Sequence, residues 1–113
     1  MGTHNYEWLE FVPSGWRDLA SNMIEEIMKI YPEYNITALK DKYGSLRCYD
    51  AGVPTVLRES INVIIDKYER LSARTCARCG KPATKYSINY ILPWCDECGV
   101  DEEKYYKRFN SGR

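Results

Sequence analysis

The sequence contains little of what catalysis and membrane insertion commonly require. It has a single histidine, His4, so histidine-dependent acid–base or triad chemistry would rest on that one residue. Its longest apolar run is Val63-Ile64-Ile65, whereas a membrane-spanning helix needs about 20 predominantly apolar residues. Glycine-rich phosphate-binding motifs and paired carboxylates in a catalytic context are also absent. We therefore expect neither an enzyme nor a membrane protein.

The N-terminal segment lacks the features of a secretory signal. The first five residues, Met1-Gly2-Thr3-His4-Asn5, have neither a basic start nor an apolar stretch. A cytoplasmic location is the resulting expectation. In a reducing compartment the five cysteines argue against a disulfide framework.

The chain has no net charge, because 16 basic side chains balance 16 acidic ones, but its two parts differ. Residues 1–73 hold 8 basic and 11 acidic side chains, which gives −3, and residues 74–113 hold 8 and 5, which gives +3. A basic C-terminal part suggests contact with nucleic acid. The candidate contacts are Arg74, Arg78, Lys104, Lys107 and Arg108.

The fold class predicted from these patterns is α+β, with a small α-β-β-α body over residues 1–73. Apolar residues recur at steps of three and four from 16 to 30, which predicts a helix that Ser14 caps and Pro32 ends. The same spacing from 57 to 71 predicts a second helix, with Pro54 in its first turn. Residues 1–13 are interpreted as a leader or a short strand on the body.

Between the two helices the sequence predicts a β-hairpin. Residues 35–39 and 45–49 suit strands, and Gly44 supplies the glycine that the bend needs. Cys48, on the second strand, is interpreted as a small buried hydrophobic residue rather than a nucleophile.

The remaining cysteines form two pairs, Cys76-x-x-Cys79 and Cys95-x-x-Cys98, separated by 15 residues. This spacing is typical of a tetrahedral Zn²⁺ site. A redox dithiol usually occurs as one pair rather than two. Gly80 and Gly99 follow the pairs directly, where backbone N–H groups fold back toward thiolates without a Cβ in the way.

Four cysteines complete the tetrahedron, so the predicted zinc is structural and has no open position for water or substrate. Residues 74–113 are expected to form a zinc-ribbon or treble-clef-like module, with a hairpin over 84–92 and a C-terminal helix over 101–110. Because a zinc ion with four thiolates carries about two negative charges, Arg78, Lys81 and Lys85 are expected to neutralise the site. This weakens the nucleic-acid interpretation.

A cluster at the hairpin tip is the candidate surface for a protein partner. Tyrosine and arginine at a protruding bend are common anchors of protein interfaces. The residues are Lys40, Lys42, Tyr43 and Arg47. The alternative interpretation is a hairpin turn with solvated ends.

Four motifs occur in order along the chain: Gly15-Trp16, residues 42–49 (Lys-Tyr-Gly-Ser-Leu-Arg-Cys-Tyr), the first cysteine pair with Gly80-Lys81-Pro82, and Trp94 with the second cysteine pair. With these motifs the chain resembles a group of small bacteriophage and bacterial proteins, mostly uncharacterised. The resemblance covers most of residues 15–99. This chain departs from the group at Cys48, where similar proteins often have an aromatic residue. The resemblance implies a phage or mobile-element accessory protein, in the host cytoplasm if phage-encoded.

Three functions follow as hypotheses. The first is a zinc-stabilised binding protein that acts by protein–protein interaction, for example by inhibiting a host or defence factor. The alternative is a zinc protein that binds nucleic acid. An enzyme or small-ligand binder is the third, and it would need a pocket.

Overall fold

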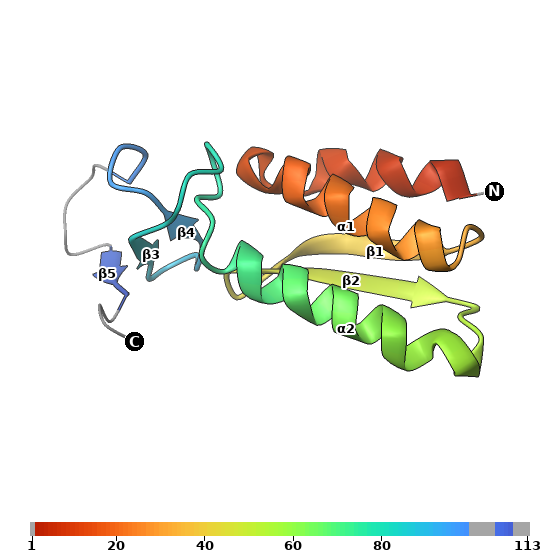
Figure 1. Cartoon of the computed structure of the whole chain (residues 1–113). Coiled ribbons are helices and arrows are strands. Elements are labelled where there is room, and N and C mark those ends of the chain that lie inside the picture. Colours follow the sequence, from red (N-terminus) through yellow and green to blue (C-terminus); the bar gives the residue numbers. More distant parts are fainter. Residues whose placement is uncertain (1, 100–105, 110–113) are drawn as a thin grey trace.

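The computed structural model describes residues 2–99 and 106–109, and it has two parts (Figure 1). The first part, here called the body, extends to the end of helix α2, and the second contains the four paired cysteines and is called the cysteine module. The elements of the body are the 3-10 helices η1 (Gly2–Phe11) and η2 (Ser14–Trp16), helix α1 (Arg17–Ile30), strands β1 (Asn35–Lys42) and β2 (Ser45–Ala51), and helix α2 (Thr55–Ser72). Those of the cysteine module are strands β3 (Lys85–Ser87), β4 (Pro93–Trp94) and β5 (Tyr106–Arg108).

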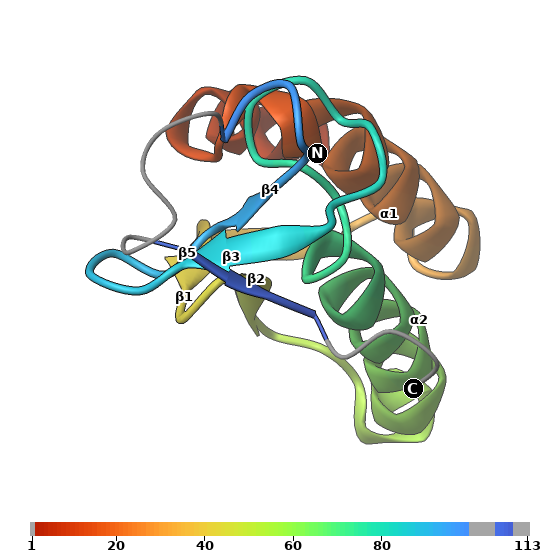
Figure 2. The same ribbon diagram turned by 90° about the vertical axis from the view of Figure 1, so that its left-hand side faces the viewer.

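The body has the expected α+β architecture, in which α1 and α2 lie on the same side of the β1–β2 hairpin (Figure 2). The helices contact each other, α2 contacts β2, and η1 contacts β1. Both helices turn the apolar face predicted from the sequence inward, and the side chains of Met23, Ile27 and Ile61 are completely buried. Among the described residues, no helix is long and apolar enough to cross a membrane.

The hairpin was predicted correctly, although each strand is longer than expected. β1 and β2 are antiparallel, with Leu39 opposite Cys48 and Lys42 opposite Ser45. The two turn residues, Tyr43 and Gly44, both have positive φ, at 53° and 86°. Positive φ at both positions is characteristic of the type I′ turn, whose twist matches that of the flanking strands.

The N-terminal segment differs from the expected leader or strand, because it forms η1. Asn5 explains its position: the buried side chain donates a hydrogen bond to the carbonyl oxygen of Tyr34 (2.8 Å) and accepts one from the backbone N–H of Ile36 (2.9 Å). These bonds satisfy two backbone groups at the start of β1 that have no strand neighbour on this side. A single amide side chain thereby fastens η1 to the sheet.

The helix predicted over 101–110 is wrong where the structure describes it. Tyr106–Arg108 forms β5, which pairs with β3 in a three-stranded antiparallel sheet of order β4-β3-β5. Cation–aromatic contacts hold this strand: the Lys85 ammonium lies 4.8 Å from the Tyr106 ring centroid, and the Arg74 guanidinium lies 4.5 Å from that of Phe109. The hairpin expected over 84–92 is only partly right: β3 pairs with β4 at Pro93–Trp94, so the second strand lies beyond the expected range.

Candidate metal centre

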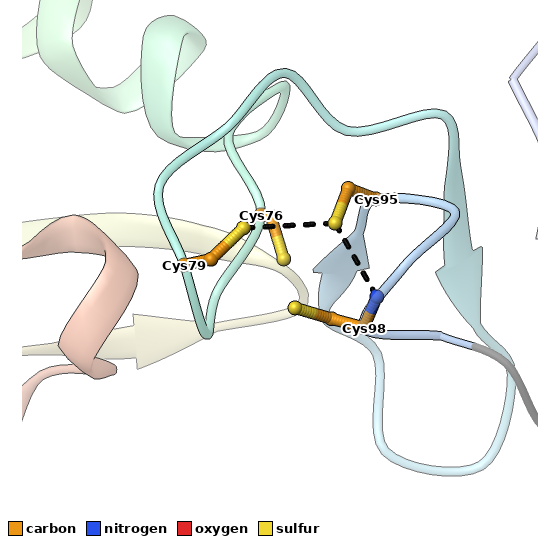
Figure 3. A group of neighbouring side chains, drawn as sticks. All are labelled: Cys76, Cys79, Cys95 and Cys98. Carbon is orange, nitrogen blue, oxygen red and sulfur yellow. Dashed lines mark hydrogen bonds between the residues drawn. The ribbon is translucent and has the colours of Figure 1, made fainter.

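Two tight turns bring the four paired cysteines together. Cys76 and Cys79 lie in the first turn and Cys95 and Cys98 in the second, and their sulfur atoms converge (Figure 3). All four Sγ atoms lie within 4.8 Å of one another, and those of Cys79 and Cys95 are 3.6 Å apart. Tetrahedral coordination with metal–sulfur bonds of about 2.3 Å places sulfur atoms about 3.8 Å apart. The cluster therefore fits a metal ion bound by four thiolates.

The backbone of each turn has the same design. The N–H of Gly80 donates to the carbonyl oxygen of Cys76 (3.0 Å), and that of Gly99 donates to Cys95 (2.9 Å). Gly80 has φ +83°, a conformation that a side chain would strain. At Gly99 an added Cβ would lie 2.9 Å from Cβ of Trp94. Each glycine is thus required, one by its backbone angle and the other by close packing.

The thiols differ in how readily they ionise. Burial acts to raise the pKa of Cys76, but backbone N–H groups of Cys79, Arg78 and Cys95 lower the pKa to about 6. Burial and the thiols around it raise the pKa of Cys98 to about 12. Without a cation the cluster resists full ionisation, because four thiolates repel one another. A bound metal ion removes this conflict, since a coordinated thiol is deprotonated.

The basic residues near the cysteines are only partly available to neutralise them. Lys81 forms an ion pair with Glu97 (2.8 Å), and this contact, more than the thiols of Cys79 and Cys95, raises its pKa. Lys85 lies over the Tyr106 ring. The expected role of these lysines in balancing the thiolates is therefore secondary to their contacts with Glu97 and Tyr106.

The first cysteine turn is fastened to the body by three consecutive residues. The Ser14 hydroxyl donates to the carbonyl oxygen of Arg78 (2.9 Å), and the N–H of Gly15 donates to that of Ala77 (2.8 Å). The buried Trp16 indole donates to the carbonyl oxygen of Thr75 (2.9 Å). Ser14 was predicted to cap α1, but its side chain contacts the cysteine turn instead, and α1 has no side-chain cap.

The close approach at this junction explains Gly15. A Cβ on this residue would lie 2.1 Å from the carbonyl oxygen of Cys76 and 2.7 Å from the backbone nitrogen of Gly80. Both atoms belong to the backbone of the cysteine turn, so no side-chain rotation relieves the clash. The Gly-Trp pair at the start of the first helix is thus part of the metal centre's support.

A second junction joins the hairpin tip to the loop before β4. The Tyr90 hydroxyl donates to the Asp41 carboxylate (2.7 Å), and Cγ2 of Ile91 packs against Gly44 at 2.9 Å from the position of an added Cβ. Beside this contact the surface has a hollow of about 270 Å³ between the hairpin tip and the sheet of the cysteine module. The hollow is thus built jointly by both parts of the chain.

The four predicted partner-binding residues are divided between two places. Tyr43 projects from the tip beside the hollow and is 75% exposed. Lys40 and Arg47 are opposite each other on the strands; the Lys40 ammonium lies over the Tyr49 ring. Arg47 contacts Ser45 (3.1 Å) and Glu69 (3.5 Å), so it also connects β2 to α2. Lys42 is exposed next to Tyr43.

The predicted nucleic-acid residues do not form one free basic patch among the described residues. Arg108 forms an ion pair with Asp96 (3.0 Å), and Arg74 stacks on Phe109. Arg78 and Lys107 are exposed, but Arg78 lies in the first cysteine turn and Lys107 on β5. Lys104 lies outside the described residues.

Cys48 is half-buried and forms part of a polar cluster. Its sulfur lies 3.3 Å from the hydroxyl of Tyr34, which donates to Asp50 (2.6 Å), and Asp50 also accepts two hydrogen bonds from Arg58 (2.8 and 2.9 Å). Burial raises the pKa of Cys48 to about 11. The contact with Tyr34 and the partial exposure differ from the small buried hydrophobic residue that was expected at this position.

Sequence reasoning missed the residues that join the two parts. Asp41 and Tyr90 gave no sign of pairing, because they are 49 positions apart. The walls of the hollow include Ile91 and Phe109, which were assigned to a strand and a helix without a binding role. The one available signal was Gly15, because a glycine at the start of a helix pattern is unusual without a close contact.

No family model, curated protein or solved structure matches this chain.

Proposed function

We propose that this chain is a zinc-stabilised binding protein that acts on a protein partner rather than by catalysis. The four thiolates would fill all positions of a tetrahedral Zn²⁺, which suits a structural rather than a catalytic ion. Its role would be to hold the cysteine module, and with it one wall of the hollow.

The observation that carries the proposal is Tyr43. A non-glycine residue with positive φ is strained by about 1–2 kcal/mol, and Asn-Gly is the preferred pair for this turn. A 75%-exposed tyrosine at φ 53° therefore contributes little to folding. Exposed tyrosine beside an apolar hollow is typical of interface anchors.

Nucleic acid is the less favoured partner. Arg108 is paired with Asp96, Lys81 is paired with Glu97, and Arg74 is stacked on Phe109. Four thiolates on a zinc ion would add about two negative charges nearby. Nucleic-acid affinity depends on several free cations that replace phosphate counterions.

The resemblance to small bacteriophage and bacterial proteins suggests the setting. In that setting the partner would be a host or defence protein in the bacterial cytoplasm, and binding would inhibit it. Binding of a protein at Tyr43 would not require a bacteriophage or bacterial origin of the chain.

The test is site-specific photo-crosslinking in bacterial cells. A benzoylphenylalanine at position 43 should crosslink to one discrete protein after nuclease treatment. The matched probe at Val56, which is 84% exposed in the first turn of α2, should not. Val56 is suited as a control because it lies 17 residues before Ala73, about 25 Å along the helix.

The crosslinked protein should then bind the purified chain directly. Tyr43→Ala should weaken that binding by about thirty-fold, with zinc content and melting temperature unchanged. Crosslinks to nucleic acid alone, or equal crosslinking at positions 43 and 56, would contradict the proposal.

A further inference from the structure

The hollow beside Tyr43 has the size and lining of a site for one side chain. Its volume of about 270 Å³ is below the roughly 300–1,000 Å³ of pockets that hold small-molecule ligands. It is open to solvent, and its lining is mostly apolar. The residues that line it include Tyr43, Ala73, Tyr86, Ile91, Pro93 and Phe109.

Aromatic rings on one side of the hollow are already arranged by the fold. The rings of Tyr86 and Phe109 are stacked, with centroids 5.9 Å apart and an interplanar angle of 26°. The Arg74 guanidinium lies over the Phe109 ring. Rings held in this way lose little side-chain entropy when a ligand packs against them.

The surroundings of the hollow are basic. Lys42 and Arg74 are the chain neighbours of the lining residues Tyr43 and Ala73, and Lys107 is the strand partner of Tyr86. All three cations are exposed. The nearest carboxylate in sequence, that of Asp41, accepts a hydrogen bond from Tyr90. Among the residues that the structure describes, a ligand at this site therefore meets more positive than negative charge.

We infer that the hollow receives one aromatic or large aliphatic side chain from an acidic segment of a protein partner. This inference rests on the proposed function and adds the chemistry of the partner. The apolar lining selects the anchoring side chain. Lys42 and Lys107 attract carboxylates on either side of it, which favours fast association and a partner of negative charge.

A single-stranded nucleic acid fits these features less well. Such ligands are bound along grooves with successive aromatic platforms for several bases. Here the rings of Tyr43, Tyr86 and Phe109 surround one hollow of about 270 Å³ instead of following a long groove. The small volume and the mostly apolar lining favour a single amino-acid side chain.

The test measures the binding of labelled probes to the full zinc-loaded chain by fluorescence anisotropy. The main probe is a short peptide of glutamates around a central tryptophan. The comparison probes have alanine in place of the tryptophan, lysines in place of the glutamates, or consist of oligothymidylate. We expect the main probe to bind at least tenfold more tightly than each of the three.

Matched variants locate the site. Lys107→Glu and Tyr43→Ala should each weaken binding of the main probe by at least fivefold. The first replaces a cation beside the hollow with a carboxylate, and the second removes an aromatic ring that lines the hollow. Lys29→Glu, in the last turn of α1, and Val56→Ala should leave it unchanged. Ala73→Phe should fill the hollow and abolish binding while the zinc content stays at one ion per chain.

Several outcomes would overturn the inference. They are no saturable binding of the main probe, equal binding of the alanine or lysine peptide, tighter binding of oligothymidylate, or self-association of the chain that Tyr43→Ala abolishes. A protein partner that crosslinks at position 43 but is insensitive to Lys107→Glu and Ala73→Phe would overturn this inference and leave the proposed function standing. The absence of any protein crosslink at position 43 would overturn both.

Discussion

The body and the cysteine module bury very different amounts of apolar surface. In the body, 14 buried side chains between Val12 and Tyr68 form one continuous cluster. In the described residues of the cysteine module, the buried side chains besides the cysteines are few and small, such as Ala77 and Pro93. The body therefore has a hydrophobic core that drives its folding, whereas we expect the module to depend on the proposed metal ion in place of such a core.

The two parts nevertheless depend on each other at their contacts. Residues 14–16 hold the first cysteine turn, and the hairpin tip supports the loop before β4. A metal ion that orders the module would also position the wall of the hollow that Tyr86 and Phe109 form. The comparison predicts that the proposed metal binding and the proposed partner binding are coupled, because the cysteine module supplies one wall of the hollow.

The largest expected effect is loss of the metal site. We expect the native protein to retain one zinc ion per chain against a competing chelator and Cys95→Ser to lose it, because structural zinc contributes about 10–16 kcal/mol. Amides of residues 76–99 should then lose protection in hydrogen-exchange measurements, while those of α1 and α2 keep it.

Cys48→Ser serves as the control. Because Cys48 lies outside the cluster of four cysteines, this variant should keep its zinc ion. If the amides of the body and of the cysteine module lost protection equally in Cys95→Ser, the body would have no stability independent of the module. That result would contradict the difference drawn between the two parts.

A smaller effect is expected at the first junction. Gly15→Ala should lower the free energy of unfolding by about 3 kcal/mol, because its Cβ would lie 2.1 Å from the carbonyl oxygen of Cys76. Gly52→Ala is the matched control: at φ +80° it is strained, but nothing lies within 4 Å of its Cβ, so about 1 kcal/mol is expected. Urea denaturation measures the free energy of unfolding of both variants. Similar losses of stability would mean that the backbone at the junction shifts to accommodate the added Cβ at Gly15.

The smallest effect is a gain in stability at the hairpin tip. Tyr43→Asn should raise the free energy of unfolding by about 0.5–1 kcal/mol, because asparagine tolerates the positive φ of this turn better than tyrosine. The same substitution should weaken binding of the protein partner. Thermal unfolding measures the change in stability, and the binding assay measures the change in affinity. A less stable variant would indicate that Tyr43 contributes to folding.

The helices and the hairpin were predictable because local patterns encode them. The three- and four-residue apolar spacing of α1 and α2 and the Gly44 turn need no knowledge of distant residues. The structure of residues 106–108 was not predictable in this way. A helix was expected from charge order alone, but pairing with β3 and contacts with Arg74 and Lys85 stabilise a strand.

By itself the sequence determined the α+β class, the body's apolar faces and the four-cysteine set, because each depends on spacing along the chain. Only the tertiary structure decided what joins these pieces. Gly15 lies against Cys76, and Asp41 pairs with Tyr90, although the residues of each pair are 49 or more positions apart. The hollow likewise combines residues of the hairpin tip with residues of the cysteine module. Such contacts follow from how the finished elements pack, and no local pattern records them.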